Sequence, residues 1–194
     1  MAMNNPENLF PEVLEFHPRI HRDGRGFFFE AWKQSSYRDA GLVDELVQLN
    51  ISRSWHGVLR GMHYQYPNPQ GKLVWVLEGE ILDVVADIRK GSPGFGKWQS
   101  YNLDSDEGKQ IYVPEGFAHG FQVLSQSATV AYMCTREYDP DGDAAIAWDD
   151  PDLNINWPLP PAVLADKDAR APRLSTIAGG SLPVFSGSTD GQAE

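Results

Sequence analysis

Between residues 47 and 135 the sequence repeats one pattern, in which short segments rich in β-branched and aromatic residues alternate with turn-forming residues. The segments recur about every 8–12 residues, and no helical period of about 10–15 residues lies between them. We therefore predict a β-sandwich or β-barrel and not an alternating α/β fold. The predicted strands are 47–52, 58–63, 72–78, 81–87, 98–103, 110–113, 119–124 and 128–135.

The N-terminal region adds two strands and a helix to this pattern. Residues 13–16 and 27–32 are β-branched or aromatic and are predicted to be strands. The polar segment 19–26 between them contains an Asp-Gly pair and is predicted to be a loop. Residues 34–41 indicate a short helix, capped by one of its serines and ended by its glycine.

The whole pattern predicts an all-β fold, a jelly-roll barrel with short peripheral helices, because a small barrel can hold one ligand in its mouth. Glu78 and Gly79 interrupt two apolar runs and indicate a hairpin. We expect one domain over residues 1–172. Residues 173–194 are rich in Gly and Ser, and we expect them to be a loosely ordered tail.

Charge and cysteine content narrow the possible partners. With 16 basic and 27 acidic residues the net charge is −11, so the chain has no bulk attraction for nucleic acid or anionic membrane. An anionic ligand must therefore meet a local basic cluster. Cys134 is the only cysteine, and no stretch approaches the ~20 apolar residues of a membrane span. These features predict a soluble protein of the cytoplasm without a disulfide.

Two segments contain a histidine together with other residues that are common in binding or catalytic sites. Arg60 and His63 lie in the run HGVLRGMHYQ, and on a regular strand they would point to opposite faces unless a bulge intervenes. His119 lies in YVPEGFAHGF, whose Pro-x-Gly-x-x-His spacing resembles the second conserved box of cupin barrels. The first box of a metal-binding cupin would offer two histidines, whereas here it offers His63 alone, and Lys72 follows it. An ammonium would repel a divalent cation, so we expect a cavity without metal.

Basic and aromatic side chains complete the pattern. Arg25, Arg60, Lys72 and Lys167 are candidates for holding a phosphate, although each alone could be a solvated surface charge. The run RGFFFE offers a ring for stacking or for packing. Taken alone, these residues indicate only a cavity that binds an anionic ligand.

In order along the chain, the motifs RGMHYQ, GKLV, DVVADIRKGSPGFG and PEGFAHGF resemble the dTDP-4-dehydrorhamnose 3,5-epimerase family. The resemblance covers roughly residues 10 to 172. It implies a cupin-type jelly roll that acts as a homodimer without metal or organic cofactor. Its substrate would be a nucleotide-linked 4-keto-6-deoxy hexose, inverted at the carbons beside the ketone.

The resemblance also implies roles for individual residues. His63 would be the base, Asp168 the carboxylate that orients it, Lys72 the cation at the developing enolate and Tyr132 the proton donor on the opposite face. Other positions would bind the nucleotide, diphosphate or sugar, some of them across the dimer. These are Arg25, Phe28, Glu30, Gln48, Asn50, Arg60, His119, Tyr138, Asp143 and Lys167.

Three departures from the family pattern leave the substrate open. Leu49 stands where an Asp is frequent, Trp75 where an Arg is common, and Ala165 where a Ser is common. An epimerase that acts only at C3 on a related nucleotide sugar is therefore the alternative. Rivals of other kinds are a metal-dependent cupin and a sugar-binding module without catalytic activity.

Overall fold

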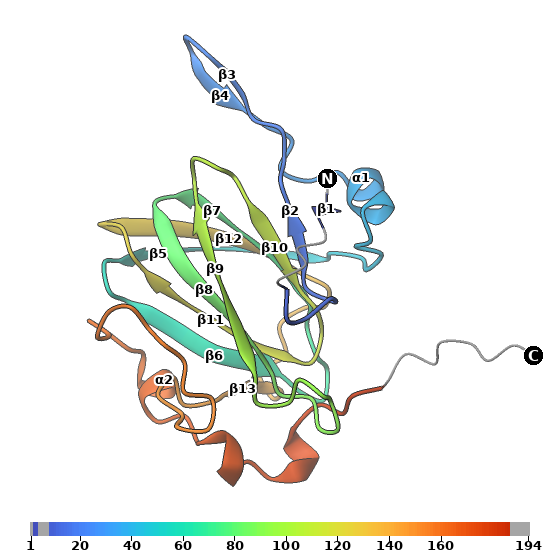
Figure 1. Ribbon diagram of the computed structural model, residues 1–194, viewed down its shortest axis with the longest axis vertical. Helices are drawn as coiled ribbons and strands as arrows, with labels where there is room; N and C mark the ends of the chain where they lie inside the picture. The colour runs from blue at the N-terminus through green and yellow to red at the C-terminus, as the bar shows by residue number, and fades with distance from the viewer. Residues whose placement is uncertain (1, 4–7, 187–194) are drawn as a thin grey trace, which may run out of the picture.

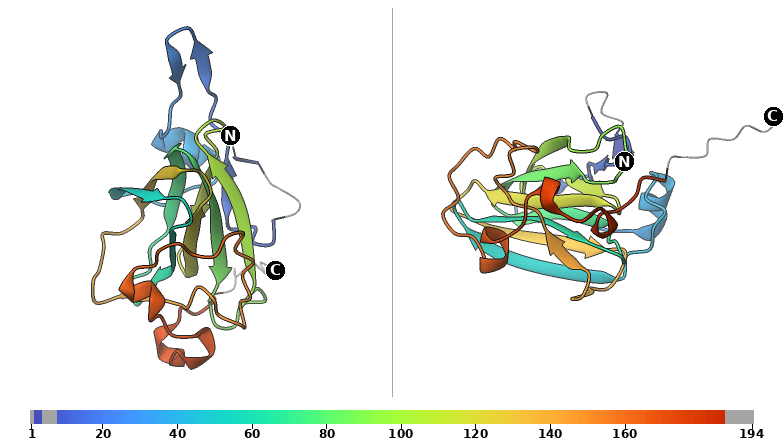
Figure 2. Two further views of the ribbon diagram at one scale, coloured as in Figure 1. Left: turned by 90° about the vertical axis from the view of Figure 1, so that its left-hand side faces the viewer. Right: turned by 90° about the horizontal axis from the view of Figure 1, so that it is seen from below.

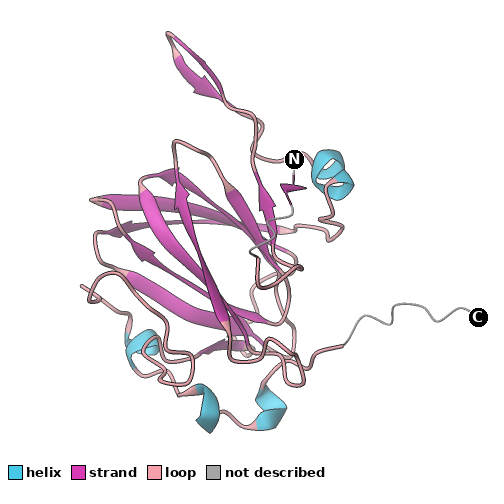
Figure 3. Cartoon of the chain, viewed as in Figure 1, coloured by secondary structure: helices cyan, strands magenta, loops and turns pink. Residues whose placement is uncertain are grey.

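The computed structural model describes residues 2–3 and 8–186, which form two facing antiparallel sheets (Figures 1 and 3). The six-stranded sheet has the order β1 (Ala2–Met3), β2 (Leu14–Phe16), β10 (Gln110–Val113), β7 (Lys72–Glu78), β12 (Ser127–Cys134), β5 (Gln48–Trp55). The five-stranded sheet has the order β13 (Asp143–Ala145), β6 (Leu59–Gln65), β11 (Phe117–Val123), β8 (Glu80–Asp87), β9 (Trp98–Asp104).

The connections confirm the jelly roll. The strands β5-β12-β7-β10 and β6-β11-β8-β9 form the two sheets, so most turns between successive strands carry the chain from one sheet to the other. All eight strands predicted between residues 47 and 135 are present, with small shifts at their ends.

The hairpin predicted at Glu78-Gly79 is wrong, because β7 and β8 lie in different sheets. Gly79 has a φ of 87°, and a Cβ there would stand 2.1 Å from the carbonyl oxygen of Ser127. The dipeptide is thus a corner between the sheets and not a reversal within one sheet. A turn signal alone cannot separate these two outcomes, since both require a sharp bend.

The space between the sheets is filled over part of its length. Buried apolar side chains from β7, β8, β9, β10, β11 and β12 form the inner core, Val74, Ile81, Leu103 and Val130 among them. Along the edge strand β5, and along β6 next to the edge strand β13, several inward side chains are polar, and cavities lie between them. The candidate site lies in the part of the space between the sheets that the apolar core does not fill.

Short helices cover the outer faces (Figure 3). Helix α1 (Gln34–Asp39) packs Tyr37 against Phe16 and Trp32 on the six-stranded sheet. Its N-cap is Lys33 without a side-chain cap, so the predicted serine cap is wrong. The other helices are α2 (Asp166–Ala169), η1 (Leu174–Thr176) and η2 (Gly179–Ser181), and no helix of the described residues could cross a membrane.

The C-terminal segment does not match the predicted loose tail as far as it is described. Leu174 and Leu182 are buried in the cluster that covers the outer face of the five-stranded sheet. The Arg89 guanidinium lies over the ring of Phe185. The expectation is therefore wrong for residues 173–186, because apolar residues spaced among the glycines and serines reach the sheet; residues 187–194 lie outside the described part.

The N-terminal region differs from the prediction in a way that matters for function. Strands β3 (His21–Asp23) and β4 (Gly26–Phe28) pair as a hairpin that projects from the sandwich (Figures 1 and 2). The predicted loop 19–26 thus contains a strand, and the predicted strand 27–32 ends at Phe28. Short polar strands such as His21–Asp23 lack the apolar alternation on which the prediction depended.

Candidate active site

Three adjoining cavities occupy the open edge of the sandwich, and His63 lines all of them. The inner cavity, about 130 Å³, is lined by Ser52, Arg60, His63, Lys72, His119 and Tyr132 among others. The Tyr138 cavity, about 310 Å³, is lined by Gln48, Asn50, Tyr138, Asp143 and Lys167. The Trp55 cavity, about 410 Å³, has Trp55, Leu59, Val163 and Leu164 in its walls.

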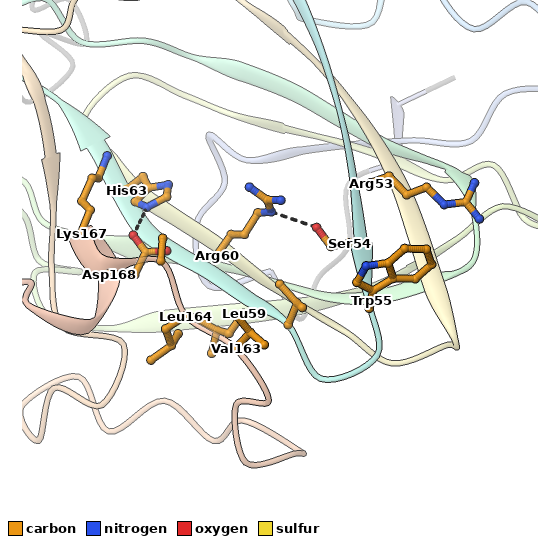
Figure 4. A pocket seen from close by; sticks show the side chains of 12 residues that line it. Arg53, Ser54, Trp55, Leu59, Arg60, His63, Val163, Leu164, Lys167 and Asp168 are labelled. Atoms are coloured by element: carbon orange, nitrogen blue, oxygen red, sulfur yellow. Dashed lines mark hydrogen bonds and ion pairs between the residues drawn. The ribbon is translucent and has the colours of Figure 1, made fainter.

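His63 and Asp168 form a hydrogen-bonded pair at the centre of the site (Figure 4). The Nε2 atom of His63 lies 2.6 Å from Oδ1 of Asp168, and Asp168 is only 3% exposed. Burial raises the pKa of Asp168, but the His63 hydrogen bond and charge, the Gly61 N–H and Lys167 together hold it below the usual value. An ionised carboxylate accepts the proton on Nε2 of His63, which leaves Nδ1 as the basic atom.

The loop before α2 brings Asp168 to this position. Gln122, completely buried on β11, donates to the carbonyl of Leu159 at 2.8 Å and accepts from its N–H at 3.1 Å. The Ala162 N–H donates to the carbonyl of Gly57. These bonds fix the loop along the start of β6, so that the carboxylate of α2 meets a histidine 105 positions earlier in the chain.

A bulge explains how Arg60 and His63 share a cavity although they are three residues apart. The pairing of β6 with β11 shifts register between His119 and Phe121, opposite the segment from Arg60 to His63. Gly61 has a φ of 130°, and a Cβ there would stand 2.5 Å from Gly120. The sequence required a bulge for Arg60 and His63 to point to the same side, and the structure has one, since both side chains line the inner cavity.

The inner cavity combines a cation, a phenol and two imidazoles. Burial lowers the pKa of Lys72, partly offset by the nearby Cys134 and Asp143. Burial also raises the pKa of Tyr132, so its hydroxyl stays protonated beyond the ordinary range of tyrosine. A base, a positive charge and a protonated acid around one small space suit proton abstraction beside a carbonyl group.

The Tyr138 cavity is polar. The Lys167 ammonium lies 2.5 Å from Oδ2 of Asp143, and Tyr138 donates to the same oxygen at 3.1 Å. Gln48 accepts from the Tyr138 N–H and donates to Asn50. The structure therefore brings together these five predicted binding residues beside the catalytic candidates.

Three predicted residues lie elsewhere in the single chain. Arg25 pairs with Asp23 at 2.6 Å on the exposed β3–β4 hairpin. Phe28 and Glu30 line a separate cavity beside α1. None of the three lines the cavities that His63 shares.

Sequence reasoning missed several residues of the site. Asp83 is fully buried and accepts from His119 at 2.7 Å; an acidic residue on the apolar face of a strand was the available signal. Ser52 and Ser54 continue the inward stripe that Gln48 and Asn50 begin on β5, which a period of two could have indicated. Ser54 accepts from Nε of Arg60 at 2.9 Å (Figure 4).

Within residues 2–3 and 8–186, no group of three or more His, Cys, Asp or Glu side chains is arranged to hold a metal ion. His63 and His119 each direct one nitrogen to an aspartate, and Lys72 lines the cavity between them. This donor set does not match a metal-binding cupin. The metal-free mechanism itself stays a prediction.

Comparisons with known proteins identify relatives of this chain. The profile of the dTDP-4-dehydrorhamnose 3,5-epimerase family matches residues 7–176. The dTDP-4-dehydrorhamnose 3,5-epimerase of Pseudomonas aeruginosa is 47% identical over 160 residues, which cover 81% of this chain and 88% of that protein.

Two solved structures extend the comparison. The dTDP-6-deoxy-D-glucose-3,5-epimerase of Legionella pneumophila, in complex with dTDP-4-keto-L-rhamnose, has a TM-score of 0.91 at 44% identity, covering 95% of this chain and 98% of that one. A 3'-monoepimerase from Streptomyces bikiniensis, in complex with dTDP-quinovose, has a TM-score of 0.82 at 36% identity, covering 89% of both chains.

Proposed function

The chain belongs to the dTDP-4-dehydrorhamnose 3,5-epimerase family, and from this premise we propose that it inverts C3 and C5 of a dTDP-linked 4-keto-6-deoxy hexose. It is an isomerase, and its fold is the cupin-like sandwich of the related epimerases. The observation that supports this chemistry best is the buried His63–Asp168 pair, beside a small cavity that also holds Lys72 and Tyr132.

The proposed reaction begins at the carbon beside the ketone. Nδ1 of His63 takes the C–H proton while Asp168 stabilises the imidazolium that forms. The electrons move to the C4 oxygen, where the Lys72 ammonium and His119 stabilise the enolate. Tyr132 then gives its proton to the carbon from the other face of the ring. The raised pKa of Tyr132 keeps its hydroxyl protonated, so that it can act as the proton donor.

The diphosphate is expected at Arg60 and Lys167, which both line the Trp55 cavity. Lys167 is shared by the Tyr138 and Trp55 cavities, and Arg60 by the inner and Trp55 cavities. Two cations at these junctions suit a group that joins a sugar inside the barrel to a nucleoside outside it. The exposed ring of Tyr138 offers a face for the base.

We further propose a homodimer. On β5, the outward residues Leu49, Ile51 and Trp55 are 55%, 61% and 65% exposed, and β5 is an edge strand. Such an apolar edge is a hazard if left uncovered. Phe28 ends β4 of the projecting hairpin, is 71% exposed and lines none of the three cavities that His63 shares. A partner copy would explain both features: the hairpin would supply Arg25 and Phe28, and the segment just after it Glu30, to the other subunit's site. A cytoplasmic location likewise stays a prediction.

The test is incubation with dTDP-4-keto-6-deoxyglucose in deuterated water, followed by NMR. Deuterium at both C3 and C5 with inverted products is the expected result, and His63→Ala should incorporate none. Label at C3 alone would replace the proposal by C3-only epimerisation, the alternative that the likeness to a 3'-monoepimerase favours. No label at either carbon would refute both.

A further inference from the structure

Within the described residues, the buried hydroxyl of Ser52 has no hydrogen-bond partner. Ser52 lines the inner cavity, and its neighbour on β12 in the pairing register is Val130, which offers no polar side chain. Ser54, two residues further on the same face of β5, is satisfied by Arg60. A buried hydroxyl without a partner costs free energy, and a group that enters the cavity would remove this cost.

The other polar groups around this space already have proposed targets. Arg60 faces the diphosphate on C1 of the sugar, and Lys72 and His119 face the oxygen on C4. The hydroxyls on C2 and C3 are left for Ser52. C3 is inverted in the reaction, so its hydroxyl changes direction and a fixed donor would meet it in only one epimer. C2 keeps its configuration and lies next to C1, just as Ser52 lies on β5 two residues before Ser54, whose hydroxyl accepts from Arg60 of β6.

We propose that Ser52 is a specificity-determining residue that binds the C2 hydroxyl of the hexose. The contact persists in substrate, enolate and product, so the ring is held at a carbon that does not react while C3 and C5 invert. The site would thereby select hexoses that retain an oxygen at C2 from 2-deoxy analogues. This inference rests on the proposed function.

The experiment is a chemical double-mutant cycle. Wild type and Ser52→Ala are each assayed for kcat/KM with the natural sugar nucleotide and with its 2-deoxy analogue. Removing the C2 hydroxyl should cost wild type roughly tenfold, the worth of a net neutral hydrogen bond at its upper end. Ser52→Ala should lose about the same with the natural substrate and little more with the 2-deoxy analogue, because the two changes remove one contact.

Two controls separate specificity from folding. Binding of sugar-free dTDP by Ser52→Ala should equal that of wild type, which shows that the variant is folded. Ser100→Ala, at a half-buried serine on β9 outside all three cavities, should keep the full wild-type preference for the C2 hydroxyl.

If Ser52→Ala still loses roughly tenfold in kcat/KM when the C2 hydroxyl is removed, the two changes act independently. That result would overturn this inference and leave the proposed function intact. If wild type epimerises neither sugar, the proposed function fails and takes the inference with it.

Discussion

Replacing Lys72 by methionine should make the protein more stable and almost inactive. The Lys72 ammonium lies inside the barrel, where burial lowers its pKa despite the nearby Cys134 and Asp143. Asp143 is committed to Lys167 at 2.5 Å, so it compensates the Lys72 charge only partly. A methionine keeps most of the length of the side chain and removes the desolvated charge.

The expected gain is about 1–3 kcal/mol in the free energy of unfolding, the range found when buried charges give way to apolar residues. Its pH dependence follows from the direction of the pKa shift. The folded state binds the lysine proton less tightly than the unfolded state, so wild-type stability rises as pH increases from the folded pKa of Lys72 towards about 10.4. The methionine variant lacks this term. The difference between the two proteins should therefore be full below the folded pKa of Lys72 and should shrink as the pH rises from there towards about 10.4.

Urea unfolding at pH 7 and at pH 10 measures the gain, and kcat measures the cost, expected at about 10²–10³-fold for a lost electrostatic contact at an oxyanion. The matched control is Lys167→Met, whose ammonium is exposed and should change stability by no more than about 0.5 kcal/mol. A Lys72→Met protein that is less stable than wild type at unchanged m, or that keeps its turnover, would refute the reasoning.

Four further outcomes are expected. Arg60→Ala should weaken dTDP binding by ~1.5–3 kcal/mol by calorimetry, because a charge-assisted bond to the diphosphate is lost; unchanged affinity would make Arg60 a structural residue. Tyr132→Phe should still exchange substrate C–H protons with deuterated water, yet form little inverted product, since abstraction and reprotonation use opposite faces. Prolonged dialysis against EDTA should leave turnover intact, and a loss restored by one divalent ion would end the metal-free mechanism. Ile51→Asp, at the 61% exposed centre of the β5 stripe, should shift the mass by light scattering from dimer to monomer; a monomeric wild type would contradict the dimer.

The sequence predicted the strands of the barrel well, because each has a clear period and turn residues at its ends. It failed where one local signal serves two geometries. Gly79 indicates a sharp bend, but only the register of the whole sheet decides between a hairpin and a corner. Leu174 and Leu182 are isolated apolar residues in a segment rich in glycine and serine, yet both are buried against the sheet. Tertiary packing therefore decided the structure here, and local composition did not.

In the site, too, features set by neighbouring residues were predicted, and contacts between residues far apart in the sequence were not predicted from spacing. The position of His63 followed from its motif, whereas its pairing at 2.6 Å with Asp168 depends on a loop held by Gln122 from another strand. The resemblance to a family supplied that pairing where spacing could not. Neither route pointed to Asp83, because the segment 81–87 was interpreted only as a strand and the burial of this carboxylate appears only in the structure.

The arrangement of charge explains how a chain of net charge −11 can take an anionic substrate. Of the basic side chains lining the three cavities, Arg53 is paired with Glu78 and Lys167 with Asp143. Within the described part of the chain, Arg60 and Lys72 form no ion pair, so their positive potential is directed into the cavities. Arg60 also lines the larger Trp55 cavity, where it can meet the diphosphate as the substrate enters, whereas Lys72 meets a full negative charge only when the enolate forms. Arg60 should therefore act mainly on substrate binding and Lys72 mainly on the chemical step.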